Sequence, residues 1–167
     1  MPENFWVFIL VGFVAQLVDG ALGMAYGVIT TTFLLSLGVS PVSASASVHI
    51  AEVITTATSG LSHWSLGNVD KTILRKLALY GMIGAVAGAY LLVNIPGETV
   101  RPFVALYLLA MGGYILLKVF RKIQPPANPP RLKILGLLGG FLDAVGGGGW
   151  GPIVSSTLIA RGGSPRY

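Results

Sequence analysis

The sequence predicts an all-α integral membrane protein, a polytopic helical bundle built from two homologous repeats with glycine-broken helices, the second repeat being incomplete. Of the 167 residues, 53% are hydrophobic and only 10% are charged, whereas a soluble domain carries about 25% charged residues. The apolar residues form blocks that are long enough to cross a hydrocarbon core of about 30 Å. An internal repeat of Gly, Asp, Ser and Pro predicts the two-part organisation.

Composition also excludes several classes of function. The chain has no cysteine, so we expect no disulfide, no thiolate metal site and no thiol relay. The net charge of +5 comes from short Lys and Arg clusters between apolar blocks, which is typical of cytoplasmic loops and does not indicate a nucleic-acid partner. The expected surroundings are the lipid bilayer. Residues 1–4 contain no Lys or Arg, so we expect no cleaved signal peptide and a first helix that stays in the mature protein.

The apolar stretch from Phe5 to Leu37 is the first predicted element. A straight helix of that length would measure roughly 50 Å, so the segment must tilt steeply, break or fold back. An aspartate and several glycines mark the breaking point, because glycine lowers helix propensity by about 1 kcal/mol and a carboxylate is costly in lipid. We expect two shorter helices that meet at an unwound stretch near residues 19–27.

Three further spans are predicted, each close to the ~20 residues that a crossing needs. They run from about 42 to 61, 73 to 93 and 100 to 120. Pro96 and Gly97 predict a short turn between the last two, which are therefore antiparallel neighbours. Gly84 and Gly88, four residues apart, allow another helix to approach closely and predict a packing face.

A basic, proline-rich loop is expected at 121–131, because its prolines cannot continue a helix. It divides the chain into a first transmembrane repeat, 1–120, and the start of a second, 132–167. Basic residues cluster in or near the loop that precedes the span 73–93 and around the proline-rich loop, at Lys71, Arg75, Lys76, Lys118, Arg121, Lys122, Arg131 and Lys133. Two spans separate the clusters, so both lie on one side. The positive-inside rule makes that side cytoplasmic, which predicts a multi-pass protein of the inner (cytoplasmic) membrane.

The internal repeat links the two parts at one fixed offset of 124 residues (136 − 12). Gly12, Asp19, Gly23, Gly27, Gly38, Ser40 and Pro41 match Gly136, Asp143, Gly147, Gly151, Gly162, Ser164 and Pro165, and Tyr26 aligns with Trp150. Such an ordered set indicates internal duplication. Paired glycine-interrupted segments in two halves point to the binding site of a secondary transporter. The alternative is two tight crossings of kinked helices without a ligand.

The pattern leaves the relative direction of the two halves open. If 5–37 crosses the membrane once, the repeat has four spans and the halves are parallel. If 5–37 is a re-entrant hairpin, the repeat has three spans and the halves are inverted. The second copy stops at Tyr167, before counterparts of the later helices. We expect a fragment of a longer protein, or else a chain that completes its fold by assembling as a homo-oligomer.

The run Val18-Asp19-Gly20 with Gly23 and Gly27, the run Gly38-Val39-Ser40-Pro41 with Ala44 and Ser47, and the glycine-rich copy from Asp143 to Pro152 resemble the sulfite exporter TauE/SafE family. This is a group of membrane permeases with two homologous halves. The likeness covers the whole chain, although members usually have both halves complete. The resemblance implies transport of a small anion, such as sulfite, a sulfonate or another organosulfur compound, across a bacterial cytoplasmic membrane. The specificity for sulfur compounds rests on the resemblance alone.

An anion in hydrocarbon needs its hydration replaced, and backbone N–H groups at the N-terminus of a half-helix are a ready replacement. The two unwound stretches could supply such ends facing each other, with an aromatic pair and hydroxyls lining the cavity. The predicted substrate-binding residues are Gly20, Gly23, Tyr26, Gly27, Thr31, Gly147, Gly149, Trp150, Gly151 and Ser155, with Thr30, Thr32 and Ser156 as further hydroxyls. As an alternative, such hydroxyls often bond their own preceding carbonyls.

Four ionisable residues are predicted to carry a coupling proton or cation: Asp19, His49, Glu52 and Asp143. The two aspartates repel an anion unless protonated, and their alternative role is to cap a half-helix. His49 and Glu52 share one face of the predicted helix 42–61, which must turn away from lipid. Histidine titrates near neutral pH, so this pair could relay a proton. The alternative is a neutral pair that fastens helices together.

No enzymatic activity, cofactor or metal is expected. A membrane-embedded enzyme using His49 and Glu52 is one alternative function, but the sequence has no Gly-x-Ser-x-Gly elbow and no zinc-hydrolase histidine pair. The four glycines at 146–149 follow no predicted strand, which argues against a phosphate loop. A non-transporting membrane assembly protein is the other alternative. It would leave the polar face of the helix 42–61 without a purpose.

Overall fold

The computed structural model of the chain describes residues 5–120 and 131–160. Most of the predicted loop at 121–131 lies outside these residues, as do Gly162, Ser164 and Pro165 of the repeat. Every regular element in the described part is helical: α1 (Phe5–Leu22), α2 (Tyr26–Ser36), α3 (Pro41–Ser65), α4 (Lys71–Asn94), α5 (Gly97–Phe120), α6 (Leu132–Gly146), the π-helical turn η1 (Trp150–Ser155) and α7 (Ser156–Ala160). The all-α fold class is therefore confirmed.

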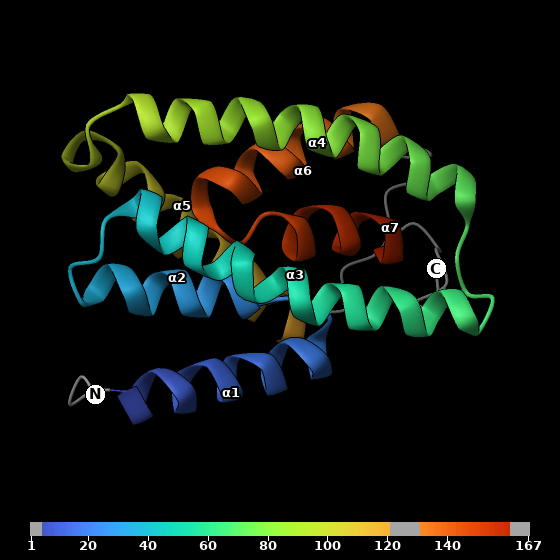
Figure 1. The fold of residues 1–167 in the computed structure, drawn as a ribbon, viewed down its shortest axis with the longest axis horizontal. Coiled ribbons are helices and arrows are strands. Elements are labelled where there is room, and N and C mark those ends of the chain that lie inside the picture. The colour runs from blue at the N-terminus through green and yellow to red at the C-terminus, as the bar shows by residue number, and fades with distance from the viewer. Residues whose placement is uncertain (1–4, 121–130, 161–167) are drawn as a thin grey trace.

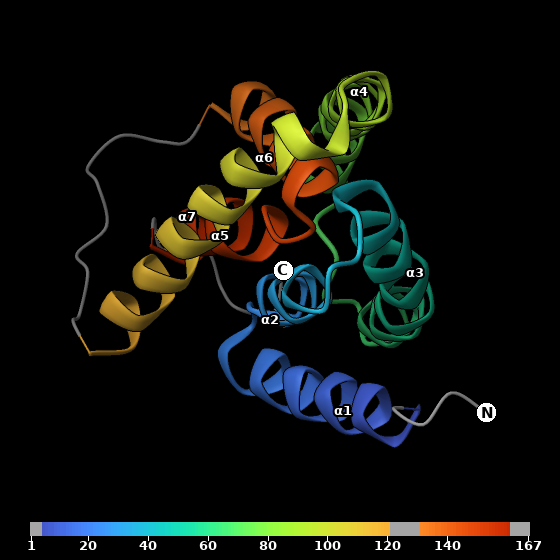
Figure 2. The same ribbon diagram turned by 90° about the vertical axis from the view of Figure 1, so that its left-hand side faces the viewer.

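The helices form a bundle with α2 near its centre. Figure 1 shows α4 and α6 along one edge and α1 along the opposite edge, and the end-on view of Figure 2 shows α1 and α3 beside α2. Among the described helices, α1, α4 and the 97–118 part of α5 are long and apolar enough to cross a membrane. Helix α3 is as long, with 25 residues, but carries the more polar sequence that contains His49 and Glu52.

Local sequence explains where the long helices begin. The hydroxyl of Ser40 accepts a hydrogen bond from Ser43 N–H, and Pro41 occupies the first turn of α3, where a missing N–H costs nothing. Asp70 caps α4 by accepting from the N–H groups of Thr72 and Ile73. Helix α3 thus begins one residue before the predicted span 42–61 and ends four residues after it.

The first apolar block folds back on itself. Helix α1 ends at Leu22 and α2 begins at Tyr26, and Figure 1 shows α2 running back toward the end of the bundle where α1 starts. Helix α6 runs in the opposite direction to α1, and the segment after it also turns back. At about 1.5 Å per residue the 11 residues of α2 span only roughly 16 Å, about half of a hydrocarbon core.

Glycines set the tightest helix pair, α4 with α6. A Cβ on Gly84 would overlap the carbonyl oxygen of Leu137, and a Cβ on Gly140 would overlap that of Gly81. Small residues allow such close approach of two backbones in a membrane. Helix α4 therefore packs mainly on α6 rather than on α5. The predicted neighbour relation of spans 73–93 and 100–120 is wrong in this respect, because the glycine face of α4 selects α6.

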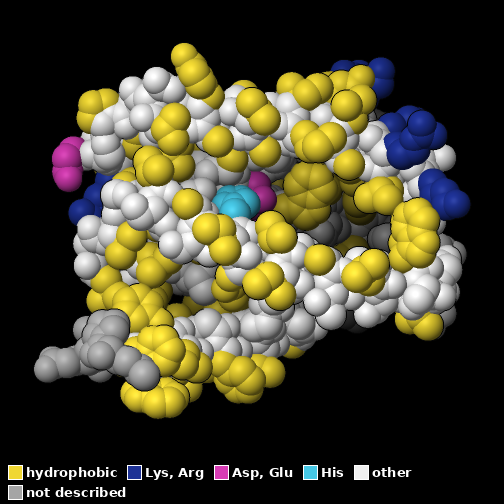
Figure 3. All heavy atoms as spheres, viewed as in Figure 1, with side chains coloured by type: hydrophobic (Ala, Val, Ile, Leu, Met, Phe, Trp, Pro, Cys, Tyr) yellow, Lys and Arg dark blue, Asp and Glu magenta, His cyan; other side chains and the backbone are white. Residues whose placement is uncertain are grey.

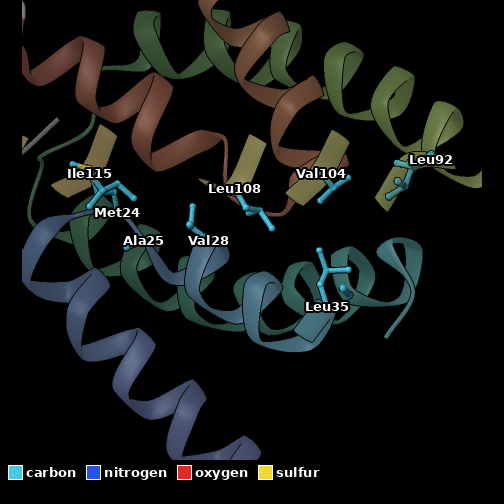
Figure 4. Packing of buried hydrophobic residues seen from close by; sticks show 10 residues of the cluster. Met24, Ala25, Val28, Leu35, Leu92, Val104, Leu108 and Ile115 are labelled. Carbon is cyan, nitrogen blue, oxygen red and sulfur yellow. The ribbon is translucent and has the colours of Figure 1, made fainter. Parts of the chain in front are cut away.

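A separate apolar core joins α2 to α5. Figure 4 shows Met24, Ala25, Val28 and Leu35 of the α2 segment facing residues of α5 such as Val104, Leu108 and Ile115. Arg101 of α5 donates a hydrogen bond of 2.7 Å to the carbonyl of Leu35, near the C-terminal end of α2, where a positive charge complements the helix dipole. These contacts hold the short helix α2 against the middle of the bundle.

Candidate functional site

The first helix break is closed by Asp19. The residue after α1, Gly23, has a φ of 69°, a left-handed conformation that favours glycine, and its N–H donates to the Asp19 carbonyl at 2.6 Å. The Asp19 carboxylate then accepts from Tyr26 N–H at 3.1 Å, at the start of α2. The aspartate therefore ends one half-helix with its main chain and caps the next with its side chain.

The second break repeats this arrangement 124 residues later. Gly147 has a φ of 66°, its N–H donates to the Asp143 carbonyl at 2.6 Å, and Asp143 Oδ1 accepts from Trp150 N–H at 3.1 Å. Asp143 Oδ1 also accepts from Gly149 N–H at 2.8 Å. The two breaks therefore have the same glycine turn and the same aspartate cap.

The two breaks cross in direct backbone contact. A Cβ on Gly27 would overlap the carbonyl oxygen of Gly147 and lie 2.9 Å from Gly148 Cα. A Cβ on Gly151 would lie 2.9 Å from Met24 Cβ. Glycine is thus required at these positions for the start of α2 to lie against the unwound stretch between α6 and η1.

His49 lies beside the second break. Its Nε2 is 3.4 Å from Asp143 Oδ2, the carboxylate oxygen that does not cap η1. Figure 3 shows one histidine next to an acidic side chain in the middle of a face of the bundle, beside a hollow. The prediction paired His49 with Glu52; in the structure the carboxylate in contact with its imidazole belongs to Asp143.

The hydrogen bonds around His49 determine where its protons lie. Nδ1 is 2.7 Å from the carbonyl of Ser45, which can only accept, so Nδ1 carries a hydrogen. The Ser45 hydroxyl donates its own hydrogen to the Ala144 carbonyl at 2.6 Å. Its oxygen can therefore only accept a hydrogen bond from Nδ1. Nε2 therefore faces Asp143 with a proton between them, because two lone pairs would repel each other. That proton belongs either to an imidazolium or to a neutral carboxylic acid.

Glu52 completes a three-residue cluster with this pair. One ligand atom from each of His49, Glu52 and Asp143 lies within 4.8 Å of the others, and all three residues are half-buried. One imidazole and two carboxylates can hold either protons or a metal cation. The predicted absence of a metal stays a prediction.

Two cavities lie beside the two breaks, each on the equivalent face of its own half-helix. One, of about 340 Å³, lies between the α3–α4 turn, α4 and η1, and includes Trp150, Val154 and Leu158. The other, of about 180 Å³, lies between α1, α2 and α3, and includes Tyr26, Thr30 and Leu34. Each residue of the first set lies 124 positions after one of the second (150 − 26). Ser155 also lines the larger cavity, where Asn68, Asp70 and His63 supply polar groups.

The remaining predicted substrate-binding residues differ in burial and in hydrogen bonding. Thr31 and Gly147 are buried at the crossing, and Gly149 is buried against the C-terminal end of α6, whereas Gly20 is exposed with no atom of another segment close to it. Thr30 and Thr32 donate to the carbonyls of Tyr26 and Val28 at 2.6 Å, in the back-bonding arrangement that was the alternative reading. Gly20 therefore takes no part in the crossing.

Sequence reasoning missed two residues near the crossing. Lys118 was assigned to the basic loop cluster, but its ammonium donates to Ser156 Oγ at 2.8 Å and lies 4.0 Å from Met24 Sδ. Tyr107 of α5 packs its ring against Gly146. The only signal in the sequence was the position of Lys118 within an otherwise apolar span. Tyr107 stands in no motif.

The comparisons with known proteins agree on one family. The family described as "Sulfite exporter TauE/SafE" matches residues 8–166. The chain is 48% identical over 168 aligned positions to "Probable membrane transporter protein YtnM" of Bacillus subtilis (strain 168), an alignment that covers 96% of this chain and 56% of that relative. The chain thus spans little more than half the length of the curated relative it matches. No solved structure gives a significant match.

Proposed function

Because the chain belongs to the sulfite exporter TauE/SafE family, a family of multi-pass membrane transporters and not of enzymes, we propose that it is a secondary transporter of a small anion. The anion class is that of sulfite, sulfonates and related organosulfur compounds, which the family description supports. The transport site lies where the two helix breaks cross, and alternating access exposes it to one side of the membrane at a time.

The observation that carries this proposal is the matched construction of the two breaks. Each has a left-handed glycine, at 23 or 147, and an aspartate, at 19 or 143, that caps the next half-helix. A tight crossing of two kinked helices needs the glycines but not two half-helix N-termini with the same cap. Half-helix ends of this kind bind ions in transporters with broken helices.

The same match supports an inverted internal repeat. The repeat offset of 124 relates the two caps and also the residues that line the two cavities. Helices α1 and α6, which are equivalent by that offset, run in opposite directions. The fold-back of α1 and α2 supports the re-entrant alternative, in which the two halves are inverted. The proposed domain boundaries, 1–120, 121–131 and 132–167, follow from the basic, proline-rich loop.

The anion site is built from neutral donors and a nearby cation. The proposed binding residues are Gly27, Thr31, Gly147, Gly149 and Gly151 at the two breaks, and Tyr26, Trp150 and Ser155 in the cavities beside them, with Gly23 at the turn of the first break and Gly20 next to it. The ammonium of Lys118 reaches Ser156 beside this crossing. That positive charge favours an anion there, because charge interactions strengthen in the low dielectric of the bundle.

His49, Glu52 and Asp143 carry the coupling proton, with Asp19 as the equivalent carboxylate at the first break. The proton between His49 and Asp143 lowers the negative charge that would otherwise repel an anion at the crossing. Binding of the anion is therefore favoured when this cluster is protonated, and release when it is not. The basic ends of α4 and α6 face the cytoplasm under the positive-inside rule.

Flux measurements test the proposal. The purified protein, reconstituted in proteoliposomes, should show saturable flux of radiolabelled sulfite or a small sulfonate, and a pH gradient should change its rate. The flux should fall in the Glu52→Gln and Asp19→Asn variants, since each removes an ionisable group from a break or from the cluster. No flux of any small anion from a well-folded protein would refute the transporter assignment for this chain.

A further inference from the structure

Two hydroxyl groups near the second break are buried without a hydrogen-bond partner among the described residues. They are Thr31 Oγ1 of α2 and Tyr107 Oη of α5. Thr31 is only 1% exposed. Buried polar groups in folded proteins are nearly always paired, so an unpaired one calls for an explanation.

Thr31 differs from its neighbours on the same helix. Thr30 and Thr32 donate to carbonyls four residues earlier, the usual arrangement for hydroxyls in membrane helices. Thr31 makes no such bond and instead directs its hydroxyl at the second break, where a Cβ on Gly147 would overlap Oγ1. Its donor is therefore left for another acceptor at that position.

Tyr107 of α5 lies against the same break. A Cβ on Gly146 would overlap its ring atoms and lie 3.5 Å from Cζ, the carbon that bears the hydroxyl. Thus Thr31 of α2 and Tyr107 of α5 each lie against one of two consecutive glycines, 147 and 146, and each carries a hydroxyl without a partner among the described residues. The glycines leave the backbone of the break free of side chains where Thr31 and the ring of Tyr107 lie against it.

We propose that Thr31 and Tyr107 are the paired hydrogen-bond donors for the transported oxyanion. The inference rests on the proposed function and names two donors of that site, one of which the sequence did not suggest. Two separate donors select an anion with at least two acceptor oxygens, such as sulfite or a sulfonate. A site built on hydrogen bonds rejects analogues that lack the matching oxygens, because its buried polar groups then stay unpaired.

The two hydroxyls also connect binding to movement. Because the second break packs against Gly27 of α2 without intervening space, an anion that joins α2 to α5 must displace the break from α2. The crossing then opens when substrate enters and closes again when it leaves.

The experiment compares variants that remove only the unpaired hydroxyls, Thr31→Val and Tyr107→Phe, with matched controls on the same helices, Thr32→Val and Tyr114→Phe. Two quantities are measured in detergent and proteoliposomes: the Tm with and without sulfite, and the KM for sulfite flux. Removing a hydroxyl without a partner does not destabilise a protein, so Tm without sulfite should stay the same or rise in both test variants. The sulfite-induced rise in Tm should disappear and KM should increase about tenfold or more, since a hydrogen bond to a charged group is lost.

Three results overturn the inference. The first is a fall in Tm without sulfite in the test variants, which would mean that the hydroxyls have structural partners. The second is a wild-type response to sulfite in both test variants, and the third is an equal loss in the control variants. If the wild type transports sulfite and the test variants keep its KM, the inference fails while the transporter stands. If the wild type shows neither flux nor a sulfite-dependent Tm, both fail.

Discussion

At the scale of single residues, Asp143 uses its two carboxylate oxygens for different tasks. Oδ1 caps η1 through the N–H groups of Gly149 and Trp150, and Oδ2 faces His49. The two roles that the sequence left as alternatives for this aspartate, a cap and a proton carrier, are therefore compatible in one side chain. A substitution at position 143 can remove the proton-carrying role and keep the cap.

The Asp143→Asn variant should keep the cap and lose the proton. An asparagine oxygen caps a helix about as well as an aspartate oxygen, so the Tm should stay near that of the wild type. The variant should lose the effect of a pH gradient on flux. Asp143→Ala should lose both and unfold about 1–2 kcal/mol more easily. Thermal unfolding and flux with and without the gradient check this, with Asp70→Asn, at the cap of α4 outside the cluster of His49, Glu52 and Asp143, as the control. Unchanged pH-driven flux in Asp143→Asn would remove this residue from coupling.

Lys118 should affect anion affinity rather than folding. Lys118→Met keeps an unbranched stem of similar length and removes the charge that lies against Ser156. The KM for sulfite should increase about tenfold, which corresponds to ~1.4 kcal/mol. Lys76→Met removes an exposed charge from the basic end of α4 and should leave KM unchanged. An equal effect of the two substitutions would indicate general attraction of anions rather than a local role.

The sequence predicted residues of the two breaks where they recur at the offset of 124 residues. Asp143, Gly147 and Trp150 could be found because equivalent residues stand 124 positions earlier. Tyr107 and Lys118 belong to α5, for which the sequence contains no copy at the offset of 124, so no repeat marked them. The contact of His49 with Asp143 joins residues 94 positions apart (143 − 49), and helical spacing suggested only the local partner Glu52.

At the scale of elements, glycine spacing predicted a close helix contact but not its partner. Gly84 and Gly88 identify a packing face on α4, yet several helices could occupy it. The choice of α6 depends on Gly136 and Gly140, which present a matching surface. The π-helical turn η1 has no signal in hydropathy, because a single shifted hydrogen-bond register leaves the apolar pattern almost unchanged.

Gly84→Ala should separate α4 from α6. The added methyl would overlap the backbone carbonyl of Leu137, which cannot move alone, so we expect a loss of about 1–3 kcal/mol in stability. Gly112→Ala on α5 is the control, because its Cβ meets no atom within 4 Å and alanine favours the helix by up to ~1 kcal/mol. Thermal unfolding in detergent, followed by circular dichroism, compares the two. Equal stability of the two variants would contradict the tight packing of α4 on α6.

At the scale of the whole molecule, hydropathy set the length of the first apolar block but not its direction. A segment of 33 residues can cross once at a steep tilt or fold back, and both satisfy the apolar pattern. In the structure the glycine turn at 23 reverses the chain. Arg101 then holds the C-terminal end of α2 at the end of the bundle where α5 begins.

Labelling of single cysteines tests this reversal, and the cysteine-free chain needs no background substitutions. Phe5→Cys, Ser36→Cys, Ser65→Cys and Thr99→Cys each place a thiol at an exposed helix end. If α1 and α2 fold back, positions 5, 36 and 99 share one side, whereas 65 lies on the other, because about 36 Å of α4 separates it from 99.

With the basic ends of α4 and α6 in the cytoplasm, a membrane-impermeant maleimide should label positions 5, 36 and 99 in intact cells. Position 65 should react only after permeabilisation. A single steep crossing instead puts 5 and 36 on opposite sides, which would exclude the re-entrant arrangement and make the two halves parallel. Labelling of 65 alone in intact cells would keep the fold-back and reverse the orientation. The inverted repeat therefore depends on positions 5 and 36, and the orientation on 65 and 99.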